Sequence, residues 1–394
     1  LPRKGDGRHR YISAEQAPQR AEAILVPKVT DDAVAYLLFT SGSTGIPKGV
    51  PVNQRNVCSY VRYTCDRYGV HEHDRFSQMF DMTFDLSVHD MFVCWERGAC
   101  LYSIPEKSVM APAKFVKDHD LTMWFSVPSV VGFMMKMGML KPGGFPTLRT
   151  SLFCGEPLPA IYAQAWQEAA PGSIVENLYG PTETTIAITQ YRWDSKTSPE
   201  VCVNGIVPIG SVFDGQEACV VDEERNGLPV GESGELCLAG SQVTQGYWNN
   251  PGKTAEQFVR IPGCGDKIWY RTGDLVKRND AGCLVYLGRM DHQVKIRGFR
   301  VELQEVDHVL RMASGVEQVA SVAWPVREGI AEGIVGFIFG GATVEVDRVI
   351  VYCRKSLPDY MVPRQIYVLD NVPLNVNGKL NRLNLVKMLE SKGV

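Results

Sequence analysis

Short apolar runs alternate with amphipathic segments over the first half of the chain. The apolar runs predict strands at Ala33–Phe39, Arg75–Phe80, Ala99–Ile104, Thr122–Val127, Leu148–Cys154 and Ile174–Asn177. Between them, apolar residues recur at spacings of three and four, which predicts helices over Asn53–Tyr68 and Ile161–Ala169. Strands that alternate with helices favour a mostly parallel sheet that helices cover on both faces.

The pattern changes after about Gly205. Gly, Asp and Asn punctuate short alternating strands such as Glu217–Val221, Glu235–Ala239 and Cys283–Tyr286, which predicts an antiparallel β-rich subdomain over about 205–290. A compact α+β segment follows, with helices at Gln304–Met312 and Val346–Lys355 and strands at Val319–Ala323 and Ile334–Phe339. We therefore predict an α/β protein with a large core at residues 1–290 and a small, mobile α+β domain at residues 291–394.

Composition and charge narrow the function classes. The chain is 45% hydrophobic and 22% charged, and its net charge of −3 gives no electrostatic reason to expect nucleic acid or an anionic membrane as a partner. No apolar run approaches the roughly 18 residues of a membrane span, and the polar, basic start lacks the apolar core of a secretion signal. Eleven scattered cysteines without a C-x-x-C pair favour free thiols in a reducing compartment, so we expect a cytoplasmic protein.

A glycine-rich stretch lies between the first predicted strand and the first predicted helix, so we expect a strand to feed a loop that opens toward a helix. Glycines let the backbone approach a phosphate, while N–H groups, hydroxyls and a lysine supply hydrogen bonds and charge. No Ser or Thr follows Lys48, which disfavours a P-loop phosphotransferase. The alternative is a flexible Ser/Gly connector. The candidate phosphate-binding residues are Thr40, Ser41, Gly42, Ser43, Thr44, Gly45 and Lys48.

Three later stretches combine turns with polar groups. The first, Asn177–Thr185, contains the carboxylate of Glu183. A carboxylate beside a phosphate loop is repelled unless a cation lies between them, so Glu183 is a candidate Mg²⁺ ligand, with a helix cap as the alternative. The stretches Tyr270–Asp274 and Gly288–Gly298 place charged groups on glycine-flanked turns, and Asp274 is suited to accept both hydrogens of a ribose diol. Taken singly, each is also consistent with an ordinary surface turn.

Together and in this order, these stretches resemble the adenylate-forming enzymes, which include acyl-CoA synthetases, luciferases and the amino-acid adenylation domains of peptide synthetases. The resemblance extends from Ala33 to Arg382, where the stretch from Pro373 onward is similar to the family's end motif. It implies a two-step reaction that uses ATP and Mg²⁺. A carboxylate attacks the α-phosphate, releases pyrophosphate and forms an acyl-adenylate, and a thiol then forms a thioester.

The resemblance also implies a role for each matched residue. Lys379 would stabilise charge near the carboxylate and the α-phosphate, and Thr182 and Glu183 would bind the phosphate and its Mg²⁺. The glycine-rich loop would hold the β- and γ-phosphates, and Asp274 would take the ribose hydroxyls with Arg289 nearby. The residues that would frame adenine are Gly155, Glu156, Pro157, Asn177, Tyr179 and Gly180.

In this family the small domain rotates between the two half-reactions. Asp291 matches the hinge position, and Lys295–Gly298 would enter the site for thioester formation. Proline at position 291 fixes a backbone angle, so we expect Asp291→Pro to impair thioester formation more than adenylation.

The stretch from Phe84 to Phe92 bears on which acid is activated. In amino-acid adenylation domains, the Asp of a Phe-Asp-x-Ser stretch pairs with the substrate's α-ammonium, and Asp85 matches it; a helix cap is the alternative. Fatty-acid and aryl-acid activators have no cation to pair there, and a buried unpaired carboxylate is costly. Cys154 looks like its counterpart in D-alanine–carrier protein ligases, whereas His89 departs from the apolar residue typical of that group. The implied pocket residues are Asp85, Leu86, His89, Ser126, Leu152, Cys154, Leu178, Ile186 and Ala187.

We therefore predict an ATP-dependent ligase that activates a small, alanine-like amino acid. The product would pass to the phosphopantetheine thiol of a carrier protein acting in trans, with no nucleic-acid or membrane partner. The alternatives are an acyl-CoA synthetase acting on another carboxylic acid, and a nucleotide-binding domain without turnover. The family normally carries a longer segment before the glycine-rich loop than the 39 residues found here, which is consistent with a fragment or an excised domain of a longer enzyme.

Overall fold

The computed structural model describes residues 28–40, 47–105, 108–290, 293–340, 344–373 and 380–391. Its largest sheet has the strand order β4-β3-β5-β6-β7-β8-β9, in which neighbours from β4 to β7 run parallel and β8 and β9 pair antiparallel. The predicted mostly parallel sheet is thus confirmed. The strands are β3 (Arg75–Gln78), β4 (Cys100–Ser103), β5 (Met123–Ser126), β6 (Thr150–Phe153), β7 (Ile174–Tyr179), β8 (Thr189–Arg192) and β9 (Ser211–Val212).

Helices bury both faces of this sheet. Along β5, Met123 and Phe125 join one core with Tyr60, whereas Trp124 joins the opposite core with Trp166, because successive side chains of a strand point to opposite faces. Both faces are therefore apolar, as expected for a buried parallel sheet. The helices and helical turns of this region are α1 (Gln54–Tyr68), α2 (Leu86–Val88), a π-helical turn (His89–Val93), α3 (Cys94–Glu96), α4 (Pro112–Asp118), α5 (Pro128–Lys136), α6 (Ala160–Ala169), a 3₁₀ turn (Thr182–Thr184) and α7 (Ser198–Val201).

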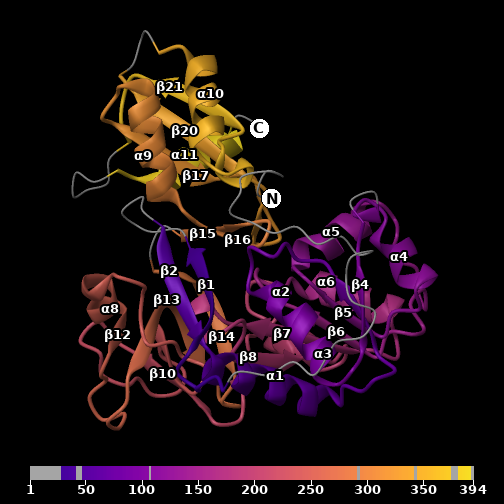
Figure 1. The fold of residues 1–394 in the computed structure, drawn as a ribbon. Helices are drawn as coiled ribbons and strands as arrows, with labels where there is room; N and C mark the ends of the chain where they lie inside the picture. The colour runs from indigo at the N-terminus through magenta and orange to yellow at the C-terminus, as the bar shows by residue number, and fades with distance from the viewer. Residues whose placement is uncertain are drawn as a thin grey trace, which may run out of the picture.

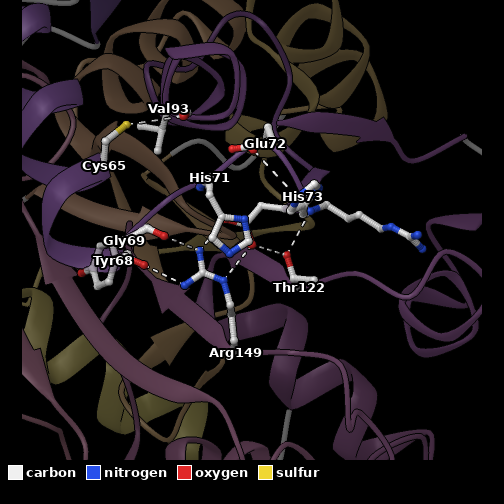
Figure 2. A network of polar contacts seen from close by, with 11 residues as sticks. Cys65, Tyr68, Gly69, His71, Glu72, His73, Val93, Thr122 and Arg149 are labelled. Carbon is white, nitrogen blue, oxygen red and sulfur yellow. Dashed lines mark hydrogen bonds and ion pairs between the residues drawn. The ribbon is translucent and has the colours of Figure 1, made fainter. Parts of the chain in front are cut away.

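A network of polar contacts joins the end of α1 to the residues that precede strands β3, β5 and β6 (Figure 2). Arg149 donates to the carbonyl of Tyr68 at the end of α1, at 2.7 Å, and its Nε donates to the buried carboxylate of Asp74, also at 2.7 Å. Asp74 further accepts hydrogen bonds from Thr122 Oγ1 at 2.7 Å and from the backbone N–H of His71 at 3.0 Å. Burial alone would raise the pKa of Asp74, but the bonds from Arg149, His71 and Thr122 outweigh burial and lower it.

The glycine-rich stretch corrects one prediction. Strand β1 (Val34–Thr40) is followed by a second strand, β2 (Lys48–Asn53), and the two form a separate antiparallel sheet in which Thr40 pairs with Lys48. The loop therefore joins two strands of a hairpin, and α1 begins only after β2. We missed β2 because Pro51 interrupts its apolar pattern, and proline is tolerated only where a strand edge needs no N–H donor. Residues 41–46 lie outside the described part of the chain.

The predicted β-rich region forms an antiparallel sheet with the order β10-β11-β13-β12, and β14 also pairs with β13. It lies beside the large sheet in Figure 1. Strand β13 matters most for the site, because its Asp274 is directly opposite Arg289 of β14. The elements are β10 (Gln216–Val221), β11 (Ser233–Gly240), α8 (Pro251–Gln257), β12 (Phe258–Val259), β13 (Trp269–Arg278) and β14 (Leu284–Arg289).

The C-terminal part is an α+β unit, shown in orange and yellow in Figure 1. One sheet has the order β17-β20-β21, and helices cover both of its faces through two apolar cores. A second sheet, β16-β15-β19-β18, lies between this unit and the large part of the molecule. The elements are β15 (Gln293–Ile296), β16 (Phe299–Glu302), α9 (Leu303–Ser314), β17 (Val319–Ala323), β18 (Val326–Arg327), β19 (Ile330–Ala331), β20 (Ile334–Phe339), α10 (Val346–Ser356), a 3₁₀ turn (Asp359–Met361), β21 (Gln365–Leu369) and α11 (Arg382–Ser391).

Among the residues that the structure describes, no helix is both long enough and apolar enough to span a membrane.

Candidate active site

A cavity of about 860 Å³ lies where the large part of the molecule meets the β15–β16 hairpin. It gathers residues from β1, α2, the end of β7, β13, β14 and β15. Many predicted site residues that are distant in sequence therefore share one space. Those that line it are Thr40, Asp85, Leu86, Cys154, Gly155, Pro157, Tyr179, Gly180, Thr182, Ile186, Asp274, Arg289 and Lys295.

Other predicted site residues do not line this cavity. The substrate candidates His89, Ser126, Leu178 and Ala187 are buried in the surrounding core, as are Lys48, Glu156, Asn177 and Glu183. Asn177 donates instead to the carbonyls of Val207 and Pro208, at 3.3 Å and 2.9 Å, so its side-chain amide stabilises the segment that contains these two residues. Predicted residues that lie outside the described part of the chain are Ser41, Gly42, Ser43, Thr44, Gly45, Asp291 and Lys379.

Asp85 places a buried carboxylate on the cavity wall. The residue is 7% exposed and immediately precedes α2. Its Oδ2 atom is enclosed and accepts no hydrogen bond from any residue that the structure describes. Burial raises the pKa of Asp85 to about 6, and the neighbouring Thr182 side chain offsets part of this rise. An enclosed acceptor without a partner is costly, so this atom is suited to a cationic group of a ligand.

Asp274 places a second carboxylate in the cavity. Tyr179 donates its hydroxyl to Oδ2 at 2.5 Å, and Arg289 Nη1 donates to Oδ1 at 2.9 Å. Arg289 also donates to the carbonyl of Thr272 at 2.7 Å. These bonds hold the carboxylate in one orientation on the strand, and since Asp274 lines the cavity, its remaining lone pairs can accept hydrogen bonds from hydroxyl groups.

The β15–β16 turn contributes to the cavity wall. Lys295 lines the cavity, and burial lowers the pKa of its ammonium. At the turn, Gly298 has a φ of +85°, and a Cβ there would lie 2.6 Å from Val127 Cγ1. Only glycine permits this approach. The neighbouring Phe299 ring lies 3.7 Å from the Tyr360 ring, centroid to centroid, in a stacked arrangement.

Glu183 lies just behind the cavity with both carboxylate oxygens engaged. Tyr247 donates its hydroxyl to Oε1 at 2.8 Å, and Arg300 Nη1 donates to Oε2 at 2.9 Å. Burial would raise the pKa of Glu183, but Arg300 and Lys48 overcome it and lower the pKa to about 2. Burial, together with Arg300, lowers the pKa of Lys48 to about 8. The cation that we expected beside this carboxylate is therefore supplied by the protein itself.

This arrangement does not fit a Mg²⁺ ion at Glu183. A Mg²⁺ ligand oxygen lies about 2.1 Å from the ion, and Arg300 occupies the approach to Oε2. Within the described ranges, no group of three or more His, Cys, Asp or Glu side chains is placed to hold a metal. No catalytic step is therefore assigned to a metal at Glu183.

His89, at the start of the π-helical turn that follows α2, forms a buried pair with Tyr60 of α1. Tyr60 Oη lies 2.8 Å from His89 Nδ1, and the imidazole also packs against Phe125 at 4.2 Å between centroids. Burial lowers the pKa of His89 to about 3, so the ring is neutral at ordinary pH. Burial likewise raises the pKa of the Cys154 thiol to about 12, which makes it an apolar part of the cavity wall rather than a nucleophile.

Sequence reasoning missed several residues of the site. Phe299 and Arg300 stand one and two positions beyond the Gly288–Gly298 stretch, so their nearness to that motif was a usable signal. Tyr247 and Tyr360 carried no such signal, because each gains its role through a contact with a distant segment.

The sequence matches two family models that agree with this site. Residues 5–248 match the AMP-binding enzyme model, and residues 305–379 match the AMP-binding enzyme C-terminal domain. The chain belongs to the AMP-binding enzyme family. The prediction of an adenylate-forming enzyme, made from the order of its motifs, is confirmed.

Several of the proteins that the chain resembles are ligases. The chain is 33% identical to the L-proline--[L-prolyl-carrier protein] ligase of Pseudomonas fluorescens, over 92% of this chain and 70% of that protein. It is 34% identical to the D-alanine--D-alanyl carrier protein ligase of Lacticaseibacillus casei, over 91% and 71%. It is also 33% identical to the delta-poly-L-ornithine synthetase of Acinetobacter baumannii, over 95% of this chain but only 27% of that longer protein.

Solved structures of AMP-binding relatives share the fold. The Vibrio cholerae adenylation domain AlmE, solved in complex with glycyl-adenosine-5'-phosphate, is 38% identical with a TM-score of 0.84, over 92% of this chain and 67% of that chain. The protein PA1221, which contains adenylation and PCP domains, has a TM-score of 0.80 over 98% and 65%. At 23% identity it supports the fold alone.

Proposed function

We propose that this protein activates a small, alanine-like amino acid with ATP and transfers it to the phosphopantetheine thiol of a carrier protein. The observation that carries the proposal is the buried carboxylate of Asp85: the residue lines the cavity, and its Oδ2 atom has no hydrogen-bond partner among the described residues. An α-ammonium group would satisfy it. The uncharged end of a fatty or aryl acid would leave it unpaired.

Asp274 and Arg289 would position the nucleotide. The Asp274 carboxylate is oriented by Tyr179 and Arg289, so it can accept hydrogen bonds from a ribose diol without reorganising. Gly155, Tyr179 and Gly180 also line the cavity and would frame the adenine. The glycine-rich loop beyond Thr40 would hold the phosphates, with Lys48 behind it.

In the first step, a carboxylate oxygen of the amino acid attacks the α-phosphorus, and the bond to pyrophosphate breaks. Negative charge builds up between two anions, so the protein must supply fixed positive charge and hydrogen-bond donors there. Thr182 lines the cavity close to Asp85, and its hydroxyl would contact the phosphate. Lys379 would come from the C-terminal segment, and its removal should cost several kcal/mol of transition-state stabilisation.

In the second step, a thiolate attacks the acyl carbon and AMP leaves. The β15–β16 hairpin would serve this step, because Lys295 and Gly298 already lie in the cavity. We further propose that residues 291–394 act as one mobile domain that turns about Asp291 between the two steps. Rotation would exchange Lys295 for Lys379 at the reacting atoms.

A small substrate side chain is favoured by the cavity wall next to Asp85. Leu86, Cys154 and Ile186 line this part with medium-sized apolar groups. A relative that shares 38% of its residues was solved with glycyl-adenosine-5'-phosphate, and another is named for D-alanine. Glycine and alanine are amino acids with little or no side chain, which supports the proposed size of the substrate.

Amino-acid-dependent exchange of labelled pyrophosphate into ATP tests this function. The panel includes glycine, both alanine enantiomers, serine, L-proline, L-ornithine, a fatty acid and an aryl acid. We expect exchange with one small amino acid, followed by loading of a phosphopantetheinylated carrier protein. Exchange with the fatty or aryl acid alone would replace the proposal with an acyl-CoA synthetase. ATP binding without exchange for any acid would indicate a domain without turnover.

A further inference from the structure

Two consecutive residues beside the cavity hold a backbone conformation that is rare for their type. Thr185 has a φ of +60° and Ile186 a φ of +71°, and both are β-branched residues, for which the left-handed region is strongly disfavoured. Thr182 before this left-handed turn and Ile186 within it both line the cavity. A strained turn of this kind persists only where its surroundings hold it in place.

The side chain of Gln242 supplies this support from a distant segment. Gln242 is fully buried in the turn after β11, and its Nε2 atom donates to the carbonyl of Ala187 at 2.7 Å. The same atom lies 3.4 Å from the carbonyls of Thr184 and Thr185. In return, Thr185 Oγ1 donates to the backbone carbonyl of Gln242 at 2.6 Å. Carbonyls before, within and after the left-handed turn therefore all face one side-chain amide.

Gln242 is itself fixed by the β-rich region. Its backbone N–H donates to Gln216 Oε1 at 3.2 Å, and Gln216 Nε2 donates to Ser241 Oγ at 3.0 Å. Gln216 begins β10 and is also buried. The Oε1 atom of Gln242 is enclosed and has no hydrogen-bond partner among the residues that the structure describes. Because an unsatisfied buried acceptor is costly, stability alone does not account for a glutamine at this position.

We propose that Gln242 is a positioning residue for the amino-acid substrate: its amide holds the left-handed turn, and the turn determines where Ile186 lies in the cavity. Burial raises the pKa of Asp85, and the backbone amide of Ile186 is close enough to offset part of this rise. A Cβ on Gly180 would lie 2.6 Å from Ala187 Cα, so the end of the turn also packs tightly against a cavity residue. The proposal rests on the proposed function for the nature of the ligand beside Asp85.

Gln242 acts on binding through the turn, because it is not itself among the residues that line the cavity. A displaced Ile186 would change the wall beside Asp85, which weakens amino-acid binding and relaxes the limit on side-chain size. Asp274 and Arg289, which we propose for the nucleotide, lie on β13 and β14 and make no contact with the turn in the hydrogen bonds described above. The KM for the amino acid should therefore respond to Gln242, and the KM for ATP should not.

Gln242→Met tests this, because methionine keeps the length of the side chain but cannot donate to the three carbonyls. Pyrophosphate exchange is measured with the amino-acid and ATP concentrations varied in turn. We expect the KM for the amino acid to rise about tenfold or more, and the KM for ATP to change by less than about twofold. Larger apolar amino acids should be activated relatively better. An unchanged KM for the amino acid in the folded variant would overturn the proposal.

Two further variants separate positioning from a general loss of stability. Gln167→Met is the matched control, because Gln167 Nε2 also donates to backbone carbonyls, those of Ala170 at 3.1 Å and Ser173 at 3.0 Å, and none of these residues lines the cavity. It should lower the urea midpoint without changing either KM. Thr185→Val removes only the bond to the Gln242 carbonyl, and it replaces Gln242→Met if that variant does not fold. A raised KM for the amino acid in Gln167→Met, or an unchanged one in Thr185→Val, would contradict the mechanism.

Hydrogen–deuterium exchange of a peptide that covers residues 180–188 distinguishes this proposal from the proposed function, because it needs no turnover. The amides of Thr185 and Ala187 donate within the turn, at 3.0 Å and 2.9 Å. Gln242→Met should speed amide exchange of this peptide by about tenfold, and Gln167→Met should not. Faster amide exchange in Gln242→Met, with no pyrophosphate exchange by the wild type for any acid, would reject the proposed function and leave the role of Gln242 in the turn intact. Normal amino-acid activation by the wild type, with unaltered amide exchange in Gln242→Met, would do the reverse.

Discussion

The ring of Phe299 packs at a steep angle against the ring of Phe84, with 4.3 Å between centroids and 66° between ring planes. Phe84 directly precedes Asp85, and Phe299 directly follows Gly298 at the tip of the β15–β16 hairpin. The contact therefore joins the position proposed for the substrate's ammonium to the hairpin proposed for thioester formation. Tyr360 stacks on Phe299 as well, and the two contacts keep its ring in place.

Phe299→Ala should slow aminoacyl transfer to the carrier protein by about tenfold and change pyrophosphate exchange by less than about twofold. Edge-on aromatic contacts contribute about 0.5–1.5 kcal/mol, and the upper value corresponds to a factor of about ten. Single-turnover measurements of each half-reaction test this expectation. Phe92→Ala, which truncates an exposed ring on the π-helical turn, is the matched control. Equal losses in both half-reactions would show that Phe299 does not act through docking.

Asp85→Asn should lower kcat/KM for the amino acid by about a hundredfold or more, because breaking a buried charge pair costs about 3–5 kcal/mol. The KM for ATP should change little. Asp81→Asn, at an exposed position four residues earlier, should behave like the wild type. Pyrophosphate exchange with both substrates varied provides the measurement. Normal activity of the Asp85→Asn enzyme would show that Asp85 does not bind the ammonium group of the substrate.

Binding of the amino acid should weaken as the pH falls below about 6. Burial raises the pKa of Asp85 to about 6 in the empty cavity, and only the ionised carboxylate attracts an ammonium group. As the pH falls through this value the protonated fraction grows, so KM for the amino acid should rise about tenfold per pH unit. Exchange assays between pH 5 and 8 test the slope. A parallel rise in the KM for ATP would point to a general loss of structure instead.

The Tyr60–His89 pair should limit the size of the accepted side chain. Because the His89 imidazole is buried and neutral, His89→Ala should vacate space below α2 and let the enzyme activate larger apolar amino acids. Tyr60→Phe keeps the ring but leaves His89 Nδ1 without its 2.8 Å partner, which should lower the free energy of unfolding by about 1–3 kcal/mol and leave the substrate profile unchanged. Exchange profiles and urea denaturation separate the two effects. An unaltered profile for His89→Ala would place the substrate elsewhere in the cavity.

Arg149→Ala should lower the free energy of unfolding by about 3 kcal/mol, because it leaves the fully buried Asp74 carboxylate without its charged partner. The pKa of Asp74 is depressed in the folded protein, so its stabilising contribution is present above the unfolded value of about 4 and is lost as the pH falls through the folded value. The variant should therefore lose less stability than the wild type on acidification. Urea denaturation at pH 7 and at about pH 2.5, well below the unfolded pKa, measures both, and equal acid sensitivity would contradict the assignment.

Much of the fold could be predicted from local pattern. Strands β17 and β20 were predicted with their observed bounds, and α1 and α9 within one or two residues of theirs. Strong periodicity and a clear helix end, such as Gly69 in the left-handed conformation after α1, make these segments readable. The hairpin of β1 and β2 was missed, because Pro51 interrupts the apolar pattern of β2.

The sequence by itself determined the types of elements, the order of the motifs and the family, since these depend on neighbouring residues and their spacing. Only the tertiary structure decided which charges meet. Glu183 was expected to need a cation, but its spacing along the chain could not show that Arg300, 117 residues later, supplies one. A carboxylate buried in a low-dielectric interior takes whichever counter-ion the folded chain brings within hydrogen-bonding distance, and that choice depends on how distant segments pack together.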